Sequence, residues 1–140
     1  MHALKYAFLS LVLLSSTIGY SQRSETDSVA IYVHKMAAHN IYELSTSVGF
    51  AGILSTQYQN FERIVSLASE EQLKQFATYH LNPVARLYCY QALKRRNSNI
   101  PENLAKQMKK DNTHVTTIMG CIVNKTTVNA LLERDVFYSY

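Results

Sequence analysis

Three side chains suited to holding a partner recur at every fourth position between residues 86 and 94. Arg86, Tyr90 and Lys94 combine a guanidinium, a phenol and an ammonium group, and their i, i+4, i+8 spacing places them on one face of a helix. Tyr and Arg are enriched among the residues that dominate binding energy. We therefore expect this row to belong to a binding surface, with a solvated helix edge as the alternative.

No pattern in the sequence predicts catalysis. His34 and His39 are five positions apart, so a helix does not bring them together as metal ligands. His80 and His114 stand at expected helix starts, where they serve as turn or cap residues. The chain has no Cys-X-X-Cys pair, no Gly-rich phosphate loop and no Gly-X-Ser-X-Gly elbow. We therefore predict no catalytic residue, no metal site and no cofactor.

Two cysteines, Cys89 and Cys121, leave two outcomes open. In an oxidising compartment two cysteines often pair, and both of these fall in segments that we expect to be neighbouring helices. Against pairing, Cys89 takes a position on an apolar helix face, and a buried thiol is a common small apolar side chain. The alternatives are a disulfide between Cys89 and Cys121 or two free thiols.

The helix that carries the Arg86 row has a clear start at Asn82 and Pro83. An Asn side chain can accept a hydrogen bond from an unpaired N–H group of the first turn, and Pro lacks the N–H that would have no partner there. Small, aromatic and aliphatic residues then recur at helical spacing and predict a face that points into the core. These residues are Ala85, Tyr88, Cys89, Ala92 and Leu93.

Helical periodicity also dominates the rest of the chain. Apolar residues recur at intervals of three and four, only four Gly and two Pro occur, and no Asn-Gly or Asp-Gly hairpin signal is present. Ser69 and Gln72 have the spacing of a capping box that opens a helix. We therefore predict an all-α domain. The expected helical stripes lie at 29–37 with an extension through Ile41 and Leu44, and at 58–68, 73–77, 85–93, 104–108, 115–123 and 128–132.

One of these stripes recurs at a fixed offset. The apolar positions of 85–93 reappear thirty residues later at 115–123, with Asn112 in the place of Asn82. A helix is expected between the two. An offset of this length that contains two short helices predicts a stacked array of helical hairpins.

The segment NPVARLYCYQAL at 82–93 resembles the second helix of a HEAT-type repeat. Residues 55–135 resemble a group of uncharacterised secreted bacterial proteins with a HEAT-like helical domain, in which a similar segment is followed by a Gly-Cys-Ile segment, here at 120–122. The resemblance implies a short HEAT-like (armadillo-type) array of antiparallel helical hairpins, either a right-handed α-α superhelix or a compact bundle. It also implies that Arg86 packs between successive repeats.

The N-terminal residues predict export. Residues 1–21 combine Lys5, an apolar run at 6–14 and small residues before the expected cleavage site, which is the pattern of a secretory signal peptide. The apolar run is short for a membrane span, although a retained anchor is an alternative. We expect a polar leader at 22–27 and one all-helical domain at 28–140, in the periplasm or outside the cell.

Charge and compartment narrow the class of partner. The net charge is +4, and removal of Lys5 leaves 13 cations against 10 acids, or +3. Mild basicity and export both argue against a nucleic-acid partner. We predict a noncatalytic exported helical-repeat protein that binds another protein or acts as a scaffold, with no stable membrane span after processing. The alternatives are a structural or assembly subunit of the cell envelope and, less favoured, an enzyme with an unrecognised site.

Overall fold

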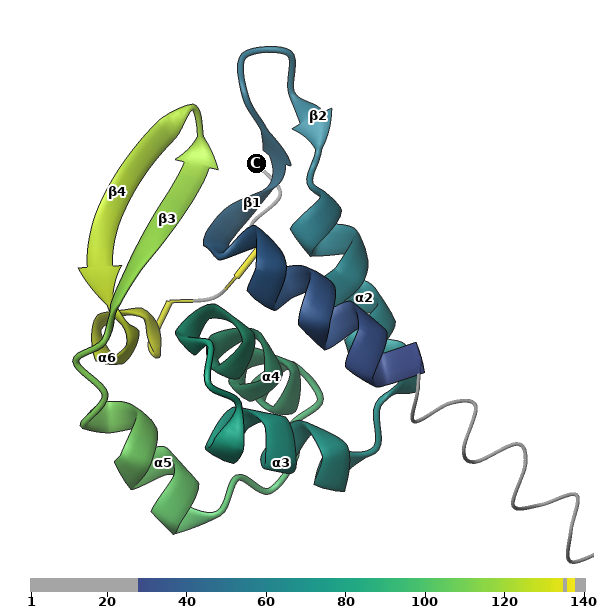
Figure 1. The fold of residues 1–140 in the computed structure, drawn as a ribbon, viewed down its shortest axis with the longest axis vertical. Coiled ribbons are helices and arrows are strands. Elements are labelled where there is room, and N and C mark those ends of the chain that lie inside the picture. Colours follow the sequence, from purple (N-terminus) through teal and green to yellow (C-terminus); the bar gives the residue numbers. More distant parts are fainter. Residues whose placement is uncertain (1–27, 135, 138–140) are drawn as a thin grey trace, which may run out of the picture.

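The structure of the protein, a computed structural model, describes residues 28–134, 136 and 137. The predicted signal peptide at 1–21 and the polar leader at 22–27 lie outside the described residues. The elements run in this order (Figure 1): a helix over 28–39, β1 (Ile41–Val48), β2 (Ile53–Leu54), α2 (Thr56–Leu67), α3 (Glu70–Tyr79), α4 (Pro83–Arg95), α5 (Glu102–Lys109), β3 (His114–Gly120), β4 (Ile122–Thr127) and α6 (Val128–Leu131).

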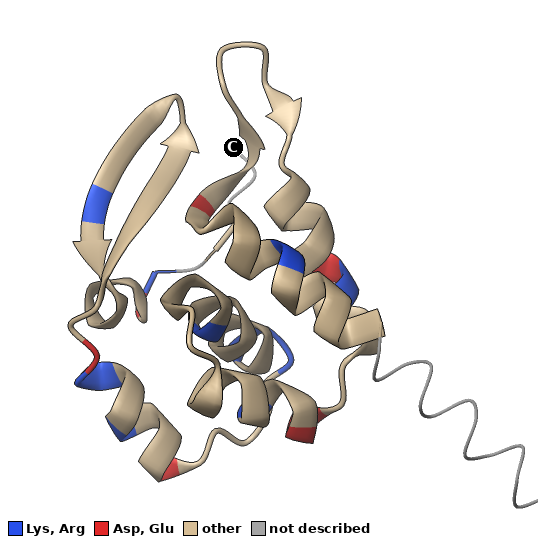
Figure 2. Cartoon of the chain, in the orientation of Figure 1, with Lys and Arg blue, Asp and Glu red and all other residues tan. Residues whose placement is uncertain are grey.

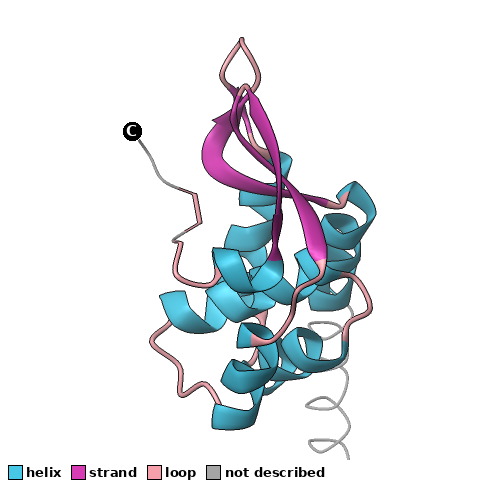
Figure 3. Cartoon of the chain, turned by 90° about the vertical axis from the view of Figure 1, so that its left-hand side faces the viewer, coloured by secondary structure: helices cyan, strands magenta, loops and turns pink. Residues whose placement is uncertain are grey.

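The four strands form one mixed sheet, so the predicted all-α, HEAT-like array is wrong. The strand order is β2-β1-β3-β4. The β1–β2 and β3–β4 pairs are antiparallel hairpins, whereas the two central strands, β1 and β3, are parallel. The hairpins rise away from the helices, which gather at the opposite end of the molecule (Figure 3). The protein is therefore an α/β domain with a helical end and a hairpin end.

The predicted helix at 115–123 is instead the β3–β4 hairpin. Met119 pairs with Ile122 across a two-residue turn made of Gly120 and Cys121. Gly120 has a φ of 58°, which favours glycine, and a Gly at the first position of such a turn suits a hairpin. Both strands are also rich in Val, Ile and Thr, which favour pleated structure. The helical spacing of the apolar residues arose from two strands that meet at a turn.

A second correction concerns the end of the first helix. Ile41 and Leu44 were expected to extend this helix but lie in β1. The helix ends because Asn40 adopts a left-handed backbone conformation with a φ of 55°, which Asn tolerates better than most residues. The N–H of Asn40 donates to the Met36 carbonyl at 3.2 Å and closes the last turn. The chain therefore leaves the helix and enters the sheet within one residue.

The local helix signals are confirmed. Ser69 and Gln72 form the capping box at the start of α3, with both reciprocal hydrogen bonds present. Asn82 caps α4 by accepting from two backbone N–H groups of its first turn at 2.9 and 3.1 Å, and Pro83 is the first helical residue. The five predicted core residues of α4 are all fully buried, and so are most of their neighbours. Helix α4 is the centre of the core.

Tyr88 of α4 joins the helical core to the sheet. Its ring lies 4.7 Å from that of Tyr42 in β1 and 5.9 Å from that of Phe61 in α2, and it stacks on Phe137 at 5.6 Å between centroids. Its hydroxyl accepts from the backbone N–H of Glu43 at 2.8 Å. Burial raises the pKa of the Tyr88 phenol, with the neighbouring Tyr42 as the next contribution, so this hydroxyl stays protonated.

Among the helices that the structure describes, none has the length and apolar character needed to cross a bilayer.

Candidate functional site

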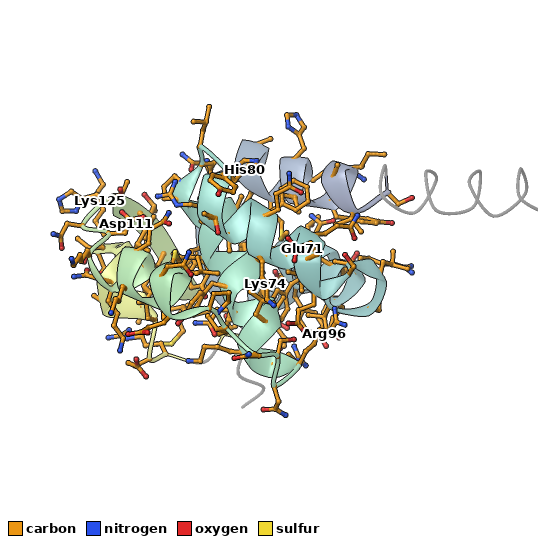
Figure 4. All side chains as sticks on the ribbon, turned by 90° about the horizontal axis from the view of Figure 1, so that it is seen from below. Glu71, Lys74, His80, Arg96, Asp111 and Lys125 are labelled. Atoms are coloured by element: carbon orange, nitrogen blue, oxygen red, sulfur yellow. The ribbon has the colours of Figure 1, made fainter. Side chains whose placement is uncertain are left out.

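Arg86, the first residue of the predicted binding row, ties together three parts of the chain. Its guanidinium donates to the backbone carbonyls of His80 and Leu81 at 2.9 and 3.1 Å, just before α4 begins. It also pairs with Asp111, between α5 and β3, at 2.5 Å. Asp111 lies at the side of the helical end (Figure 4). These contacts give Arg86 a role in holding neighbouring elements together.

The other two residues of the row are also engaged inside the protein. Tyr90 is buried, and burial together with the nearby charge of Glu133 raises the pKa of its phenol. The ammonium group of Lys94 donates to the backbone carbonyl of Leu132 at 2.7 Å. Since internal contacts occupy much of the row, other surfaces of the molecule are better placed to hold a partner.

Cys89 and Cys121 are both free thiols in the structure. Cys89 is buried in α4, whereas Cys121 is exposed at the turn between β3 and β4. Burial raises the pKa of the Cys89 thiol far above its usual range, which suppresses the reactive thiolate. The pairing of Cys89 with Cys121 in the native protein stays a prediction, which thiol titration tests.

We expect one thiol of the native protein to react with a thiol reagent and both to react after unfolding. The fast thiol should be Cys121, because it is exposed, and the Cys121→Ser variant should lose the native reaction. Thiol titration before and after denaturant, with peptide mapping of the labelled residue, measures both. Failure of either thiol to react in the unfolded, unreduced protein would instead show a disulfide.

A groove of about 920 Å³ lies between the 28–39 helix, the β1–β2 hairpin and the first turns of α2. The helices contribute mainly polar side chains to its lining, whereas the strands contribute apolar side chains and the carboxylate of Glu43. The polar lining includes Tyr32, Lys35, His39, Glu43, Gln57 and Asn60.

Glu43 is the central polar residue of this groove, although only 4% of it is exposed. One carboxylate oxygen accepts from Nε2 of His39 at 2.9 Å, and the other accepts from the hydroxyl of Ser55. Ser55 caps α2 by accepting from the N–H of Tyr58 at 2.8 Å. The carboxylate thus joins the first helix, β1 and α2. Because the acid stands between the serine and the histidine, these three side chains do not form a nucleophile activated by a histidine base.

Gln57 provides a second polar group in the groove, and it is only 1% exposed. Its amide nitrogen donates to the carbonyls of Met36 and Ile41 at 3.3 and 2.9 Å. These two acceptors fix the orientation of the amide, because a flipped amide would set oxygen against oxygen. The amide oxygen has no hydrogen-bond partner among the described residues. A buried acceptor without a donor is uncommon in folded proteins.

The tips of the two hairpins carry a second candidate surface, which we call the apolar end. The tips are adjacent, since the N–H of Gly49 donates to the carbonyl of Gly120 at 3.0 Å. Large apolar side chains project from them into solvent. The apolar end comprises Phe50, which is fully exposed, Ile53 (68% exposed), Leu54 (51%), Ile122 (58%) and Val123 (62%).

The two segments that carry the apolar end have no charged side chains. Residues 44–61 and 112–124 contain no Lys, Arg, Asp or Glu. In the hairpin strands the charged residues are Glu43 on β1 and Lys125 on β4, and Figure 2 shows the hairpins almost entirely in the tan of the remaining residue types. The helical end is different and displays charged side chains, among them Glu71, Lys74 and Arg96 (Figure 4). The molecule is therefore polarised, with an apolar end opposite a charged one.

Sequence analysis missed Glu43, Ser55, Gln57 and the apolar end. One signal was present, because the four-residue spacing from His39 to Glu43 allows a contact within a helix, but Asn40 ends the helix between them. The lack of charge around the hairpins was a second signal. Within the described part of the chain, no group of three or more His, Cys, Asp or Glu side chains is placed to hold a metal ion.

Searches of protein-family models, curated proteins and solved structures found no match to this chain. The resemblance to secreted HEAT-like proteins therefore stays a hypothesis. The fold defines the class, a single-core α/β domain with a four-stranded mixed sheet. Because one fold can host many functions, function has to be argued from the surfaces described above.

Proposed function

We propose that the protein is an exported, noncatalytic binding module that holds another protein through its apolar end. The observation that carries the proposal is the cluster of exposed apolar side chains on two adjacent hairpin tips. Large apolar side chains that gather in an exposed region commonly mark a site of interaction. Burial of such side chains contributes roughly 25 cal/mol per Å², so a partner that covers them gains binding free energy.

The chemistry of the apolar end also indicates the kind of partner. A nucleic acid requires Lys or Arg near its phosphates, and residues 44–61 and 112–124, which carry the apolar end, contain neither. The complementary surface is therefore an uncharged, apolar patch on a protein. Phe50 is the expected anchor, because aromatic side chains dominate the energy of protein interfaces and none of the described residues covers this one.

Site-specific crosslinking tests this proposal. A photoreactive residue in place of Phe50, in protein produced in its native cells, should form a covalent adduct with one partner protein. The matched control is the same residue in place of Leu81, which is 95% exposed but lies before α4, outside the apolar end. The control should give no such adduct.

A second substitution separates contact from chance proximity. Ile122→Ser should reduce the adduct formed at position 50, because Ile122 belongs to the same exposed cluster. The proposal fails if position 50 gives no adduct, or if position 81 gives the same one with equal yield. An adduct with a second copy of this chain would indicate self-assembly in place of a distinct partner.

A further inference from the structure

We propose that the groove beside Glu43 is a binding site for a primary ammonium group carried on an aliphatic chain. The groove adjoins the apolar end and shares Ile53 and Leu54 with it, but Phe50, the anchor of the proposed contact, does not line the groove. Three features support this assignment: a buried acceptor without a donor, a buried carboxylate, and an apolar wall beside them.

The buried acceptor is the amide oxygen of Gln57. The nitrogen of this amide is committed to two backbone carbonyls, so the side chain cannot turn to satisfy its oxygen. An ammonium group is a donor only, with three N–H bonds, and it matches an acceptor of this kind. A hydrogen bond between a charged donor and a buried acceptor is stronger than one between neutral groups.

The carboxylate of Glu43 adds negative charge to the same site. Its two partners are the ring of His39 and the hydroxyl of Ser55. Neither an imidazole nor a hydroxyl carries a permanent positive charge, and a buried carboxylate is favoured by a cation nearby. Each carboxylate oxygen has lone pairs for more than one hydrogen bond and can accept from a further donor. Lys35 lines the groove as well, but the ion-pair partner of Glu43 among the described residues is His39.

The rest of the groove suits methylene groups. Apart from Glu43 and Gly49, the residues that the β1–β2 hairpin and β3 contribute to the groove lining have apolar side chains. An aliphatic chain bound along this wall would be removed from water while its ammonium group meets the acceptors. The side chains of the wall are Val48, Ile53, Leu54 and Ile118.

Titration with a matched series of probes tests the site in the full-length protein. Hexylamine, hexanol and hexanoate share one chain and differ in the head group. Followed by backbone amide chemical shifts, hexylamine should bind about tenfold more tightly than hexanol, since a charged donor strengthens the hydrogen bonds. Hexanoate should bind more weakly than either, because it meets a carboxylate. The shifts should centre on Glu43 and Gln57.

Two buried glutamines provide a matched pair of variants. Gln57→Leu should weaken hexylamine binding about tenfold, because it removes the unpartnered acceptor. Gln91→Leu is the control: Gln91 is 3% exposed and its amide nitrogen also donates to backbone carbonyls, among them that of Arg134 at 3.0 Å, but it does not line the groove. Lys35→Ala should strengthen hexylamine binding about twofold by removing a nearby like charge.

The probes also distinguish two sources of the ammonium group, a free amine and the side chain of a protein. Binding by hexylamine alone indicates a free amine, whereas equal binding by a lysine blocked at both ends indicates a side chain of a protein.

Three results would each overturn the proposal. Hexanoate could bind as tightly as hexylamine, the chemical shifts could centre outside the groove, or a folded Gln57→Leu variant could bind hexylamine with unchanged affinity. If Gln57→Leu does not fold, the ranking of the three probes decides. Phe50→Ser should bind hexylamine normally, because Phe50 does not line the groove, so failure of the contact at Phe50 and failure of the ammonium site can be told apart.

Discussion

Tyr88→Ala should lower the free energy of unfolding by about 4 kcal/mol, as expected when a large aromatic side chain is removed from a packed core. Tyr88 is fully buried and contacts aromatic rings on β1, on α2 and at Phe137. The substitution leaves a cavity where the helices meet the sheet. It also leaves the N–H of Glu43 without its acceptor. Urea unfolding, monitored by circular dichroism, measures the change.

Two further variants divide this loss into its parts. Tyr88→Phe keeps the ring and removes the hydroxyl, so it should cost about 1–2 kcal/mol, the penalty for an unsatisfied buried donor. Tyr79→Ala is the control, because Tyr79 is 78% exposed and its loss should change stability by less than about 0.5 kcal/mol. Equal stability of the Tyr88→Ala variant and the wild-type protein would contradict the central position assigned to this ring.

Arg86→Ala should cost about 2–3 kcal/mol, somewhat less than the loss for breaking a fully buried ion pair. The side chains of Arg86 and Asp111 are 13% and 15% exposed, so solvent screens them only in part. Removal of the guanidinium leaves Asp111 unpaired and takes the donor from the carbonyls of His80 and Leu81. The control is Arg95→Ala, since Arg95 pairs with Glu62 on the surface and such pairs contribute less than about 1 kcal/mol.

The cost of Arg86→Ala should depend on pH with a defined sign. Burial alone raises the pKa of Asp111, but hydrogen bonds from Thr113 and the Arg86 guanidinium outweigh it and hold this pKa below its usual range. A depressed pKa in the folded state contributes stability above the unfolded pKa, and this contribution is lost as pH falls through the folded pKa. The deficit of Arg86→Ala should therefore shrink in acid. A deficit that grows as pH falls would contradict the pair.

The helices could be predicted because their signals are local. The capping box of Ser69 and Gln72 and the Asn82–Pro83 start each lie within a few residues, and the structure contains both. The sheet could not be predicted in the same way, because it depends on turns and on pairing between strands that are distant in the sequence. Gly120 supplies the turn that breaks the apparent helix at 115–123, and Asn40 does the same after the first helix. Periodicity alone cannot separate a helical stripe from two strands joined by such a turn.

The candidate sites were harder to predict for the same reason. Glu43 meets Ser55 only because the β1–β2 hairpin folds back and brings the start of α2 beside β1. The amide of Gln57 reaches the carbonyl of Ile41 through the same reversal. Arg86 could be singled out by residue type, but its contact with Asp111 joins elements on either side of α5. The residue type of Arg86 indicated that it makes an important contact, and the fold determined that this contact is with Asp111 inside the protein.

The parallel pairing of the two central strands sets the order in which the chain can assemble. Ile41 pairs with Thr116, 75 residues later, and all of α2 to α5 lies between them. Closing so long a loop costs chain entropy before the pairing returns any stability, so refolding should be governed by sheet closure after the helices have formed. During synthesis, β1 leaves the ribosome long before β3 exists. Until then its free edge is open to other chains, which makes the unfinished protein a natural client for a chaperone.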